Sequence, residues 1–205
     1  MSDHTSKAES SSTSIAIIGL GYVGLPLAIQ FANAGLHVIG VDVDASKIET
    51  LEKGESYIGH IEKAQITELY AKGQFVATND FSRLTTCDAI ILCVPTPLNK
   101  YREPDLSYVL DTGAAIAPYL KDGVVVCLES TTYPGTTENE LRAAVEARSG
   151  KTAGREFHLA YSPEREDPSN PESKVERIPK LVGGLTPKCR EKAIAYRVRN
   201  STFGQ

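Results

Sequence analysis

Three glycines at fixed spacing, followed by a distant carboxylate, carry the clearest chemical signal in this sequence. Gly19, Gly21 and Gly24 come directly after the apolar run 15–18, and a stretch with apolar residues at helical spacing follows them. A second apolar run then ends at Asp42, close to the distance of about 20 residues at which dinucleotide-binding βαβ units carry their acidic residue. This order of strand, glycine-rich turn, helix, strand and carboxylate predicts a dinucleotide site.

Each part of the glycine-rich segment has a physical reason. Gly19 permits a tight turn out of the first strand, and Gly21 lets the backbone approach a pyrophosphate closely because it has no Cβ. Gly24 lets the following helix pack near the sheet. The N-terminus of that helix, near Tyr22 and Val23, offers N–H groups and a partial positive charge to the pyrophosphate.

The carboxylate of Asp42 indicates which dinucleotide is preferred. A carboxylate at this place can accept hydrogen bonds from ribose hydroxyls and would repel a 2′-phosphate, so the sequence favours NAD over NADP. The alternative is a fold of the same class that has a glycine-rich turn and binds no cofactor.

The bulk properties narrow the class of protein. The 205 residues, 41% hydrophobic and 23% charged, suit a soluble protein with one large domain, or one domain and part of another. The net charge of −4 and a pI near 5.6 argue against general binding to nucleic acid or anionic membranes. No apolar run approaches the ~20 residues that a membrane span requires.

The N-terminal segment and the cysteines bear on the cellular compartment. Residues 1–13 are rich in serine and threonine and lack the apolar core of a secretory signal, so we expect a disordered tail. The four cysteines show no C-x-x-C pairing and the four histidines are scattered, so no metal site is predicted. The chain is therefore expected to be cytoplasmic and metal-free.

Apolar runs and amphipathic stretches alternate along the rest of the chain. After the first unit, helices are expected at 45–53, 61–72, 108–120 and 136–148, and strands at 74–78, 88–94, 123–128, 157–161 and 180–183. Such alternation with short connections predicts a Rossmann-like α/β fold over residues 14–185. This is a doubly wound, mostly parallel sheet with helices on both faces.

Hydroxyls and a carboxylate follow three successive buried strands of this expected sheet. Thr96 comes after the first of these strands, Ser130 and Thr131 after the second, and Glu164 after the third. Ligands of open parallel sheets bind beyond the carboxyl ends of the strands, so these residues are candidates for a site. The alternative is that they merely form turns, for which serine and proline suit the geometry.

With these residues assembled, the chain resembles the N-terminal part of the UDP-glucose/GDP-mannose dehydrogenase family, the nucleotide-sugar 6-dehydrogenases. The resemblance runs over residues 14–185 and depends on the glycine-rich segment and three further motifs, at 94–97, 130–131 and 162–165. The segments 54–58, 96–98 with 104–108, and 130–135 resemble the branch that acts on UDP-N-acetylhexosamines, with GlcNAc or ManNAc as the sugar, more than the UDP-glucose branch.

The resemblance implies an activity and a role for individual residues. Such enzymes oxidise the C6 alcohol of a nucleotide sugar to a carboxylate with two NAD⁺, through an aldehyde and a cysteine thioester, and full-length members are expected to be homo-oligomers. Glu164 would be the acid/base in thioester hydrolysis, and Arg165 and Glu166 would line the UDP-sugar. The residues that would bind NAD are Gly19, Gly21, Tyr22, Val23, Gly24, Asp42, Lys47, Thr96, Ser130 and Thr131.

The sequence also departs from the family pattern. The glycine-rich segment that carries the family's nucleophilic cysteine is not found here, nor are the lysine and asparagine of its central helix. Cys189 lacks the flanking glycines, and residues 186–205 are interpreted as the start of a truncated central helix with an irregular tail. The chain alone is therefore expected to be inactive. A non-catalytic NAD(H)-binding module is the alternative, and an unrelated two-domain dehydrogenase is disfavoured by the 162–165 motif.

Overall fold

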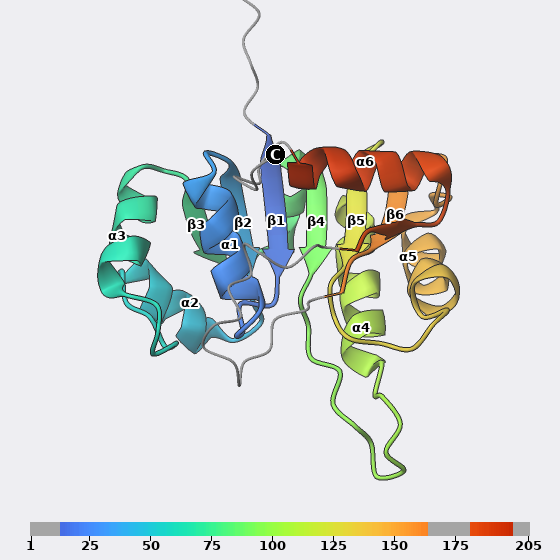
Figure 1. The fold of residues 1–205 in the computed structure, drawn as a ribbon, viewed down its shortest axis with the longest axis horizontal. Helices are drawn as coiled ribbons and strands as arrows, with labels where there is room; N and C mark the ends of the chain where they lie inside the picture. Colours follow the sequence, from blue (N-terminus) through green and yellow to red (C-terminus); the bar gives the residue numbers. More distant parts are fainter. Residues whose placement is uncertain (1–12, 164–180, 199–205) are drawn as a thin grey trace, which may run out of the picture.

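The computed structural model describes residues 13–163 and 181–198, and these form a seven-stranded sheet in the order β3-β2-β1-β4-β5-β6-β7 (Figure 1). Strands β1 to β6 are parallel, and β7 pairs antiparallel with β6. The predicted doubly wound sheet is confirmed. The strands are β1 Ser14–Ile18, β2 His37–Val41, β3 Phe75–Thr78, β4 Ala89–Leu92, β5 Val125–Leu128, β6 His158–Tyr161 and β7 Gly183–Gly184.

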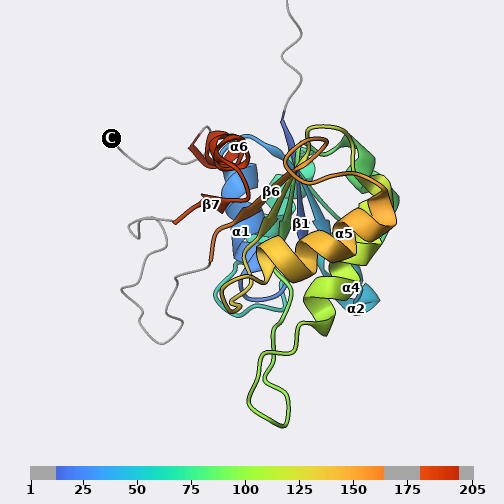
Figure 2. The same ribbon diagram turned by 90° about the vertical axis from the view of Figure 1, so that its right-hand side faces the viewer.

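Helices cover both faces of the sheet. Helices α1 and α6 lie on one face and α4 and α5 on the other (Figure 2). The α-helices are α1 Gly24–Asn33, α2 Ala45–Glu52, α3 Lys63–Ala71, α4 Ser107–Ile116, α5 Arg142–Ser149 and α6 Pro187–Val198. Short 3₁₀-helices at Phe81–Thr86 and Ala117–Tyr119 and a π-helical turn at Thr137–Leu141 complete the described elements.

The apolar strand runs reflect burial on two sides. In β1, Ile15 and Ile17 belong to the core under α1, whereas Ala16 and Ile18 belong to the core under α4 and α5. Because successive side chains of a strand point to opposite faces, a strand covered on both faces must be apolar throughout.

Some element boundaries differ from the sequence-based predictions. The strand expected at 180–183 is the two-residue β7, which runs antiparallel at the sheet edge. The helix expected at 136–148 begins with a π-helical turn before α5. The helix expected at 108–120 changes to 3₁₀ geometry at Ala117–Tyr119, where Pro118 lacks the N–H that an α-helix requires.

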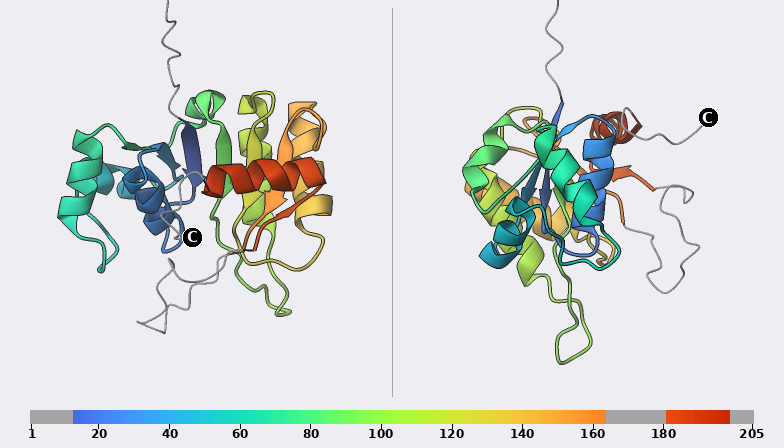
Figure 3. Two further views of the ribbon diagram at one scale, coloured as in Figure 1. Left: turned by 45° about the horizontal axis from the view of Figure 1, so that its top comes forward. Right: turned by 90° about the vertical axis from the view of Figure 1, so that its left-hand side faces the viewer.

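Helix α6 crosses the sheet over β5 and β6 rather than extending away from it (Figure 3). Its residues Cys189 and Ala193 are buried against the sheet. Cys189 Sγ lies 3.7 Å from Nδ1 of His158, which is also buried. No helix within the described ranges is long and apolar enough to cross a membrane.

Candidate cofactor site

The backbone of the turn after β1 requires glycine at two positions, Gly19 and Gly24. Gly19 has φ +91°, and a Cβ there would lie 2.6 Å from the carbonyl oxygen of Cys93. A Cβ on Gly24 would lie 1.8 Å from the carbonyl oxygen of Gly19. Real Cβ atoms do not approach backbone so closely, so the start of α1 can lie against β1 because both positions are glycine.

Gly21 differs from its neighbours because a Cβ there would meet no atom within 4 Å. Packing against the described residues therefore does not explain this glycine, whereas a backbone without a side chain lets a pyrophosphate approach closely. Helix α1 begins next to it, and its N-cap Val23 makes no side-chain capping hydrogen bond. The Tyr22 side chain is exposed. The residues present thus fit the phosphate groups of a dinucleotide at a helix N-terminus.

Asp42 holds this turn from the end of β2. Its carboxylate is buried, and Oδ2 accepts hydrogen bonds from the Leu20 N–H at 2.8 Å and from Lys47 Nζ at 2.9 Å. Oδ1 accepts from the Asp44 N–H at 3.0 Å. A carboxylate accepts about four hydrogen bonds in all. Asp42 therefore fixes the glycine-rich turn and retains room for about one further donor.

Lys47 lies on α2, whose first turn is capped by the side chain of Asp44. Its ammonium forms an ion pair with Asp42 and is partly exposed. Lys47 thus lies beside Asp42, the carboxylate that the sequence predicts to contact the ribose.

Tyr57 was not recognised as a site residue from the sequence. It lies between α2 and α3, and its hydroxyl donates to the carbonyl oxygen of Leu20. Burial, followed by the negative charges of Asp42 and Asp44, raises the pKa of this phenol well above its usual value. No periodic pattern in the loop marks Tyr57, because its partner is a backbone atom of a distant turn.

The loops after β4 and β5 are joined at the same edge of the sheet. The Thr96 hydroxyl donates to the carbonyl oxygen of Thr131 at 2.7 Å, and the Ser130 hydroxyl donates to that of Val94 at 2.6 Å. Ser130 is buried, whereas the Thr131 side chain is exposed. The structure therefore brings together Thr96, which follows one predicted strand, and Ser130 and Thr131, which follow the next.

A cavity of about 410 Å³ opens beside these loops, at the ends of β5 and β6. Ser162 follows Tyr161 of the cavity wall in the sequence, and its buried hydroxyl has no hydrogen-bond partner among residues 13–163 and 181–198. The predicted residues Glu164, Arg165 and Glu166 lie outside the described residues. The lining consists of residues 132–135, Thr137, Glu138, Ala160, Tyr161 and residues 183–185.

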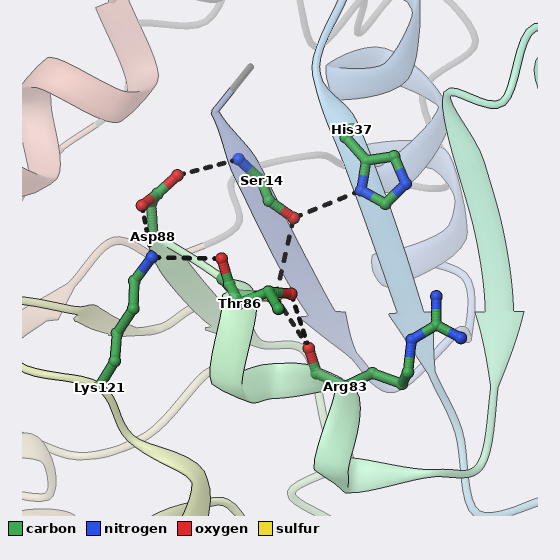
Figure 4. Close-up of polar contacts among 7 residues, drawn as sticks. Ser14, His37, Arg83, Thr86, Asp88 and Lys121 are labelled. Atoms are coloured by element: carbon green, nitrogen blue, oxygen red, sulfur yellow. Dashed lines mark hydrogen bonds and ion pairs between the residues drawn. The ribbon is translucent and has the colours of Figure 1, made fainter. Parts of the chain in front are cut away.

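A second polar cluster lies at the opposite edge of the sheet (Figure 4). Asp88 accepts from the Ser14 N–H at 3.0 Å and pairs with Lys121 at 2.7 Å, while the Ser14 hydroxyl lies 3.4 Å from His37 Nδ1. These contacts connect the amino ends of β1, β2 and β4, away from the edge where ligands of such sheets bind. Within residues 13–163 and 181–198, no group of His, Cys, Asp and Glu is placed to hold a metal ion.

A doubly wound sheet with a glycine-rich turn at a helix N-terminus defines a dinucleotide-binding domain. Residues 13–198 match the NAD binding domain of the UDP-glucose/GDP-mannose dehydrogenase family, and the chain belongs to this family. Its cofactor is therefore NAD, as the sequence predicted.

Relatives in this family agree with the predicted branch. The chain is 35% identical over 177 residues to UDP-N-acetyl-D-glucosamine 6-dehydrogenase of Pseudomonas aeruginosa, which covers 86% of this chain and 41% of that protein. It is 35% identical over 193 residues to UDP-N-acetyl-D-mannosamine dehydrogenase of Yersinia pestis. This match covers 90% of this chain and 45% of that protein. The crystal structure of NDP-N-acetyl-D-galactosaminuronic acid dehydrogenase from Methanosarcina mazei Go1 superposes with a TM-score of 0.86 at 34% identity. The superposition covers 95% of this chain and 43% of that protein. The chain thus spans less than half the length of these relatives.

Proposed function

We propose that this chain supplies the NAD site of a nucleotide-sugar 6-dehydrogenase that oxidises a UDP-N-acetylhexosamine to its uronic acid. The observation that carries the proposal is the open backbone at Gly21 beside the uncapped start of α1. Neither a positive φ nor a close neighbour among the described residues requires glycine at position 21, and the lack of a side chain there lets a pyrophosphate approach the backbone. The names of the relatives support the sugar class.

The residues around the turn have distinct tasks in the proposed complex. The N–H groups near Tyr22, Val23 and Gly24 would bind the pyrophosphate at the positive end of α1. Asp42 and Lys47 would contact the adenosine ribose from the end of β2 and the start of α2. When bound, NAD⁺ supplies a nicotinamide that accepts the hydride from the substrate.

The loops after β4 and β5 would bind the cofactor farther along the same edge. The hydrogen bonds of Thr96 and Ser130 to the neighbouring loops hold this surface together, and the exposed side chain of Thr131 would face the cofactor. The cavity at the ends of β5 and β6 lies next to them and would admit part of the substrate.

The proposed substrate contacts follow β6 along the chain. On the family resemblance, Glu164 would act as acid/base in thioester hydrolysis, and Arg165 and Glu166 would bind the UDP-sugar. The buried hydroxyl of Ser162, two residues before Glu164, supports a polar function at this strand end, because a buried hydroxyl without a partner among the described residues is costly.

A non-catalytic NAD(H)-binding module is the second candidate. The observation behind it is that three of the four thiols in these 205 residues, those of Cys87, Cys127 and Cys189, are buried and that Cys93 is half-buried. The two candidates share the cofactor site and differ in turnover.

Calorimetric titration of the 205-residue chain with NAD⁺ and NADP⁺ tests the cofactor site. We expect tighter binding of NAD⁺, because a 2′-phosphate would approach the carboxylate of Asp42. Equal affinities would contradict this assignment. Turnover is tested separately by NADH absorbance with UDP-N-acetylglucosamine and UDP-N-acetylmannosamine, using a polypeptide of the same gene that contains the family's cysteine segment. NAD⁺ binding without turnover by that longer protein would favour the non-catalytic module.

We also propose a cytoplasmic location and homo-oligomeric assembly for the full-length protein, without nucleic-acid or membrane partners. None of the four cysteines, all of which the structure describes, forms a disulfide, which suits a reducing compartment. The net charge of −4 disfavours polyanionic partners. Cell fractionation and analytical ultracentrifugation test these two points.

A further inference from the structure

Leu20, between the first two glycines of the turn, is held by groups from two other segments, the end of β2 and the loop between α2 and α3. Its N–H donates to Asp42, and its carbonyl oxygen accepts from the Tyr57 hydroxyl. Its side chain is fully buried over Gly40 of β2, where a Cβ would lie 2.8 Å from Leu20 Cδ2. The peptide groups on both sides of Leu20 and its side chain are therefore all fixed from outside the turn.

Tyr57 reaches this turn from the loop that joins α2 to α3. It is half-buried and packs against the core on the α1 face of the sheet. Lys47 Nζ lies 6.0 Å from the centre of the Tyr57 ring and also pairs with Asp42. Asp42 and Tyr57 thus both bond to Leu20. Lys47 connects them, because it pairs with Asp42 and lies near the Tyr57 ring.

The direction of the Tyr57 hydrogen bond is fixed by chemistry. A carbonyl oxygen accepts and cannot donate, so the phenol must keep its proton for the contact to exist. Burial and the nearby carboxylates of Asp42 and Asp44 raise the pKa of Tyr57, so it remains a donor across the physiological pH range. The contact is therefore not a pH-sensitive one.

We propose that Tyr57 is a positioning residue for NAD, whose hydroxyl keeps the glycine-rich turn in the shape that receives the pyrophosphate. Cofactor binding would then also order residues 54–60, and this loop would affect the cofactor through its contact with Leu20. The inference rests on the proposed placement of NAD at this turn. A merely structural Tyr57, which only packs its loop against the core, would alter stability and leave cofactor affinity unchanged.

The test compares Tyr57→Phe with Tyr70→Phe in the 205-residue chain. Tyr70 on α3 is also half-buried, and its hydroxyl also contacts backbone, accepting from the Ala77 N–H at 3.1 Å. That contact is made to β3, which β2 separates from β1 and the glycine-rich turn. Each substitution removes one hydroxyl and keeps the ring, so the pair is matched in chemistry and differs in place.

Calorimetric titration with NAD⁺ and with ADP-ribose gives the readout. We expect Tyr57→Phe to lower the affinity for both ligands equally, by at least fivefold, because both carry the pyrophosphate. Tyr70→Phe should change either affinity less than twofold. An unchanged affinity in Tyr57→Phe, or the same loss in both variants, overturns the inference while the wild-type chain still binds NAD⁺. Absence of wild-type binding would instead overturn the proposed function, and this inference with it.

Hydrogen exchange of the wild-type chain tests the role of Tyr57 if Tyr57→Phe does not fold. Added NAD⁺ should slow amide exchange in residues 54–60 together with residues 19–24. The segment around Tyr70 should not change. Unaltered exchange in residues 54–60 when residues 19–24 become protected would overturn the coupling through Tyr57.

Discussion

Asp42 shows how one carboxylate can serve both the fold and the proposed cofactor site. The sequence assigned it to the ribose, and the structure adds that it accepts hydrogen bonds from two backbone N–H groups and from Lys47. Because it is buried, the removal of its carboxylate leaves these donors without a partner. Its effect on cofactor binding is therefore transmitted through the turn as well as through direct contact.

Asp42→Ala should weaken NAD⁺ binding about tenfold or more and lower the free energy of unfolding by about 1–3 kcal/mol. The reason is the loss of a charged acceptor from the Leu20 N–H and the Lys47 ammonium. Calorimetry and urea unfolding measure the two effects.

Asp44→Ala is the control for this variant. Asp44 is exposed and caps α2 through the Ser46 N–H, two residues from Asp42. This variant should leave NAD⁺ affinity within twofold of wild type. A comparable loss of affinity in both variants would show that α2, rather than the carboxylate of Asp42, determines binding.

At the scale of elements, the turn between β1 and α1 separates two reasons for a glycine. Gly24 is required by packing, since its Cβ would collide with the carbonyl oxygen of Gly19. A Cβ at Gly21 would meet none of the described residues within 4 Å, so this part of the fold would accept a side chain there. The two positions look alike in the sequence motif and differ in the structure.

Gly21→Ala should fold with a cooperative transition near that of wild type but lose NAD⁺ affinity by at least tenfold, because the new methyl would occupy the place of the pyrophosphate. Gly24→Ala should instead lower stability by about 3 kcal/mol or more through steric conflict with the backbone. Thermal unfolding and calorimetry measure both. Normal NAD⁺ affinity in a folded Gly21→Ala would place the cofactor elsewhere.

The contact between α6 and β6 predicts a dependence of stability on pH. Burial, and then the positive charges of Lys188 and Lys192, lower the pKa of His158 below its usual value. Below about pH 6.5 the unfolded chain takes up a proton at this histidine that the folded chain does not yet bind. This contribution to the free energy of unfolding therefore decreases as the pH falls through this range.

His158→Asn should flatten the fall in stability between about pH 7 and the lower pKa of the folded state, because asparagine does not titrate there. Urea unfolding at several pH values gives the slope. His60→Asn is the control, since His60 is exposed and its replacement should leave the slope as in wild type. An unchanged slope in His158→Asn would show that other groups cause the pH dependence.

At the scale of the whole molecule, one edge of the sheet collects the proposed functional groups. The glycine-rich turn, the loops after β4 and β5 and the cavity beside β6 all lie at the carboxyl ends of the strands, whereas the cluster around Asp88 lies at the amino ends. Three of the four cysteines, Cys87, Cys127 and Cys189, are buried, whereas Cys93 follows β4 and is half-buried against the glycine-rich turn.

The 205-residue chain should therefore bind NAD⁺ without oxidising UDP-N-acetylhexosamines. Nucleophile and acid/base act as a unit, so a polypeptide without the family's cysteine segment loses most of the rate advantage. Incubation with NAD⁺ and each UDP-sugar, followed by NADH absorbance and mass spectrometry, checks this. Formation of two NADH per sugar would contradict it and would point to one of the four cysteines as the nucleophile.

The sequence by itself determined the features that local chemistry controls. The glycine spacing, the buried strand runs and the placement of Asp42 after β2 could be predicted, because each depends on neighbours within a few turns or on burial of a whole strand. The fold class, the cofactor and the family followed from these features and are confirmed.

Only the tertiary structure decided which distant residues meet. The bond from Tyr57 to Leu20 joins positions 37 residues apart, and the Thr96–Thr131 bond joins positions 35 residues apart. The place of α6 over His158 and the antiparallel direction of β7 likewise depend on how the chain closes on itself. Such contacts involve single side chains and backbone atoms without a repeating pattern. They arise because strands far apart in sequence end at the same edge of one sheet, which only the folded chain brings about.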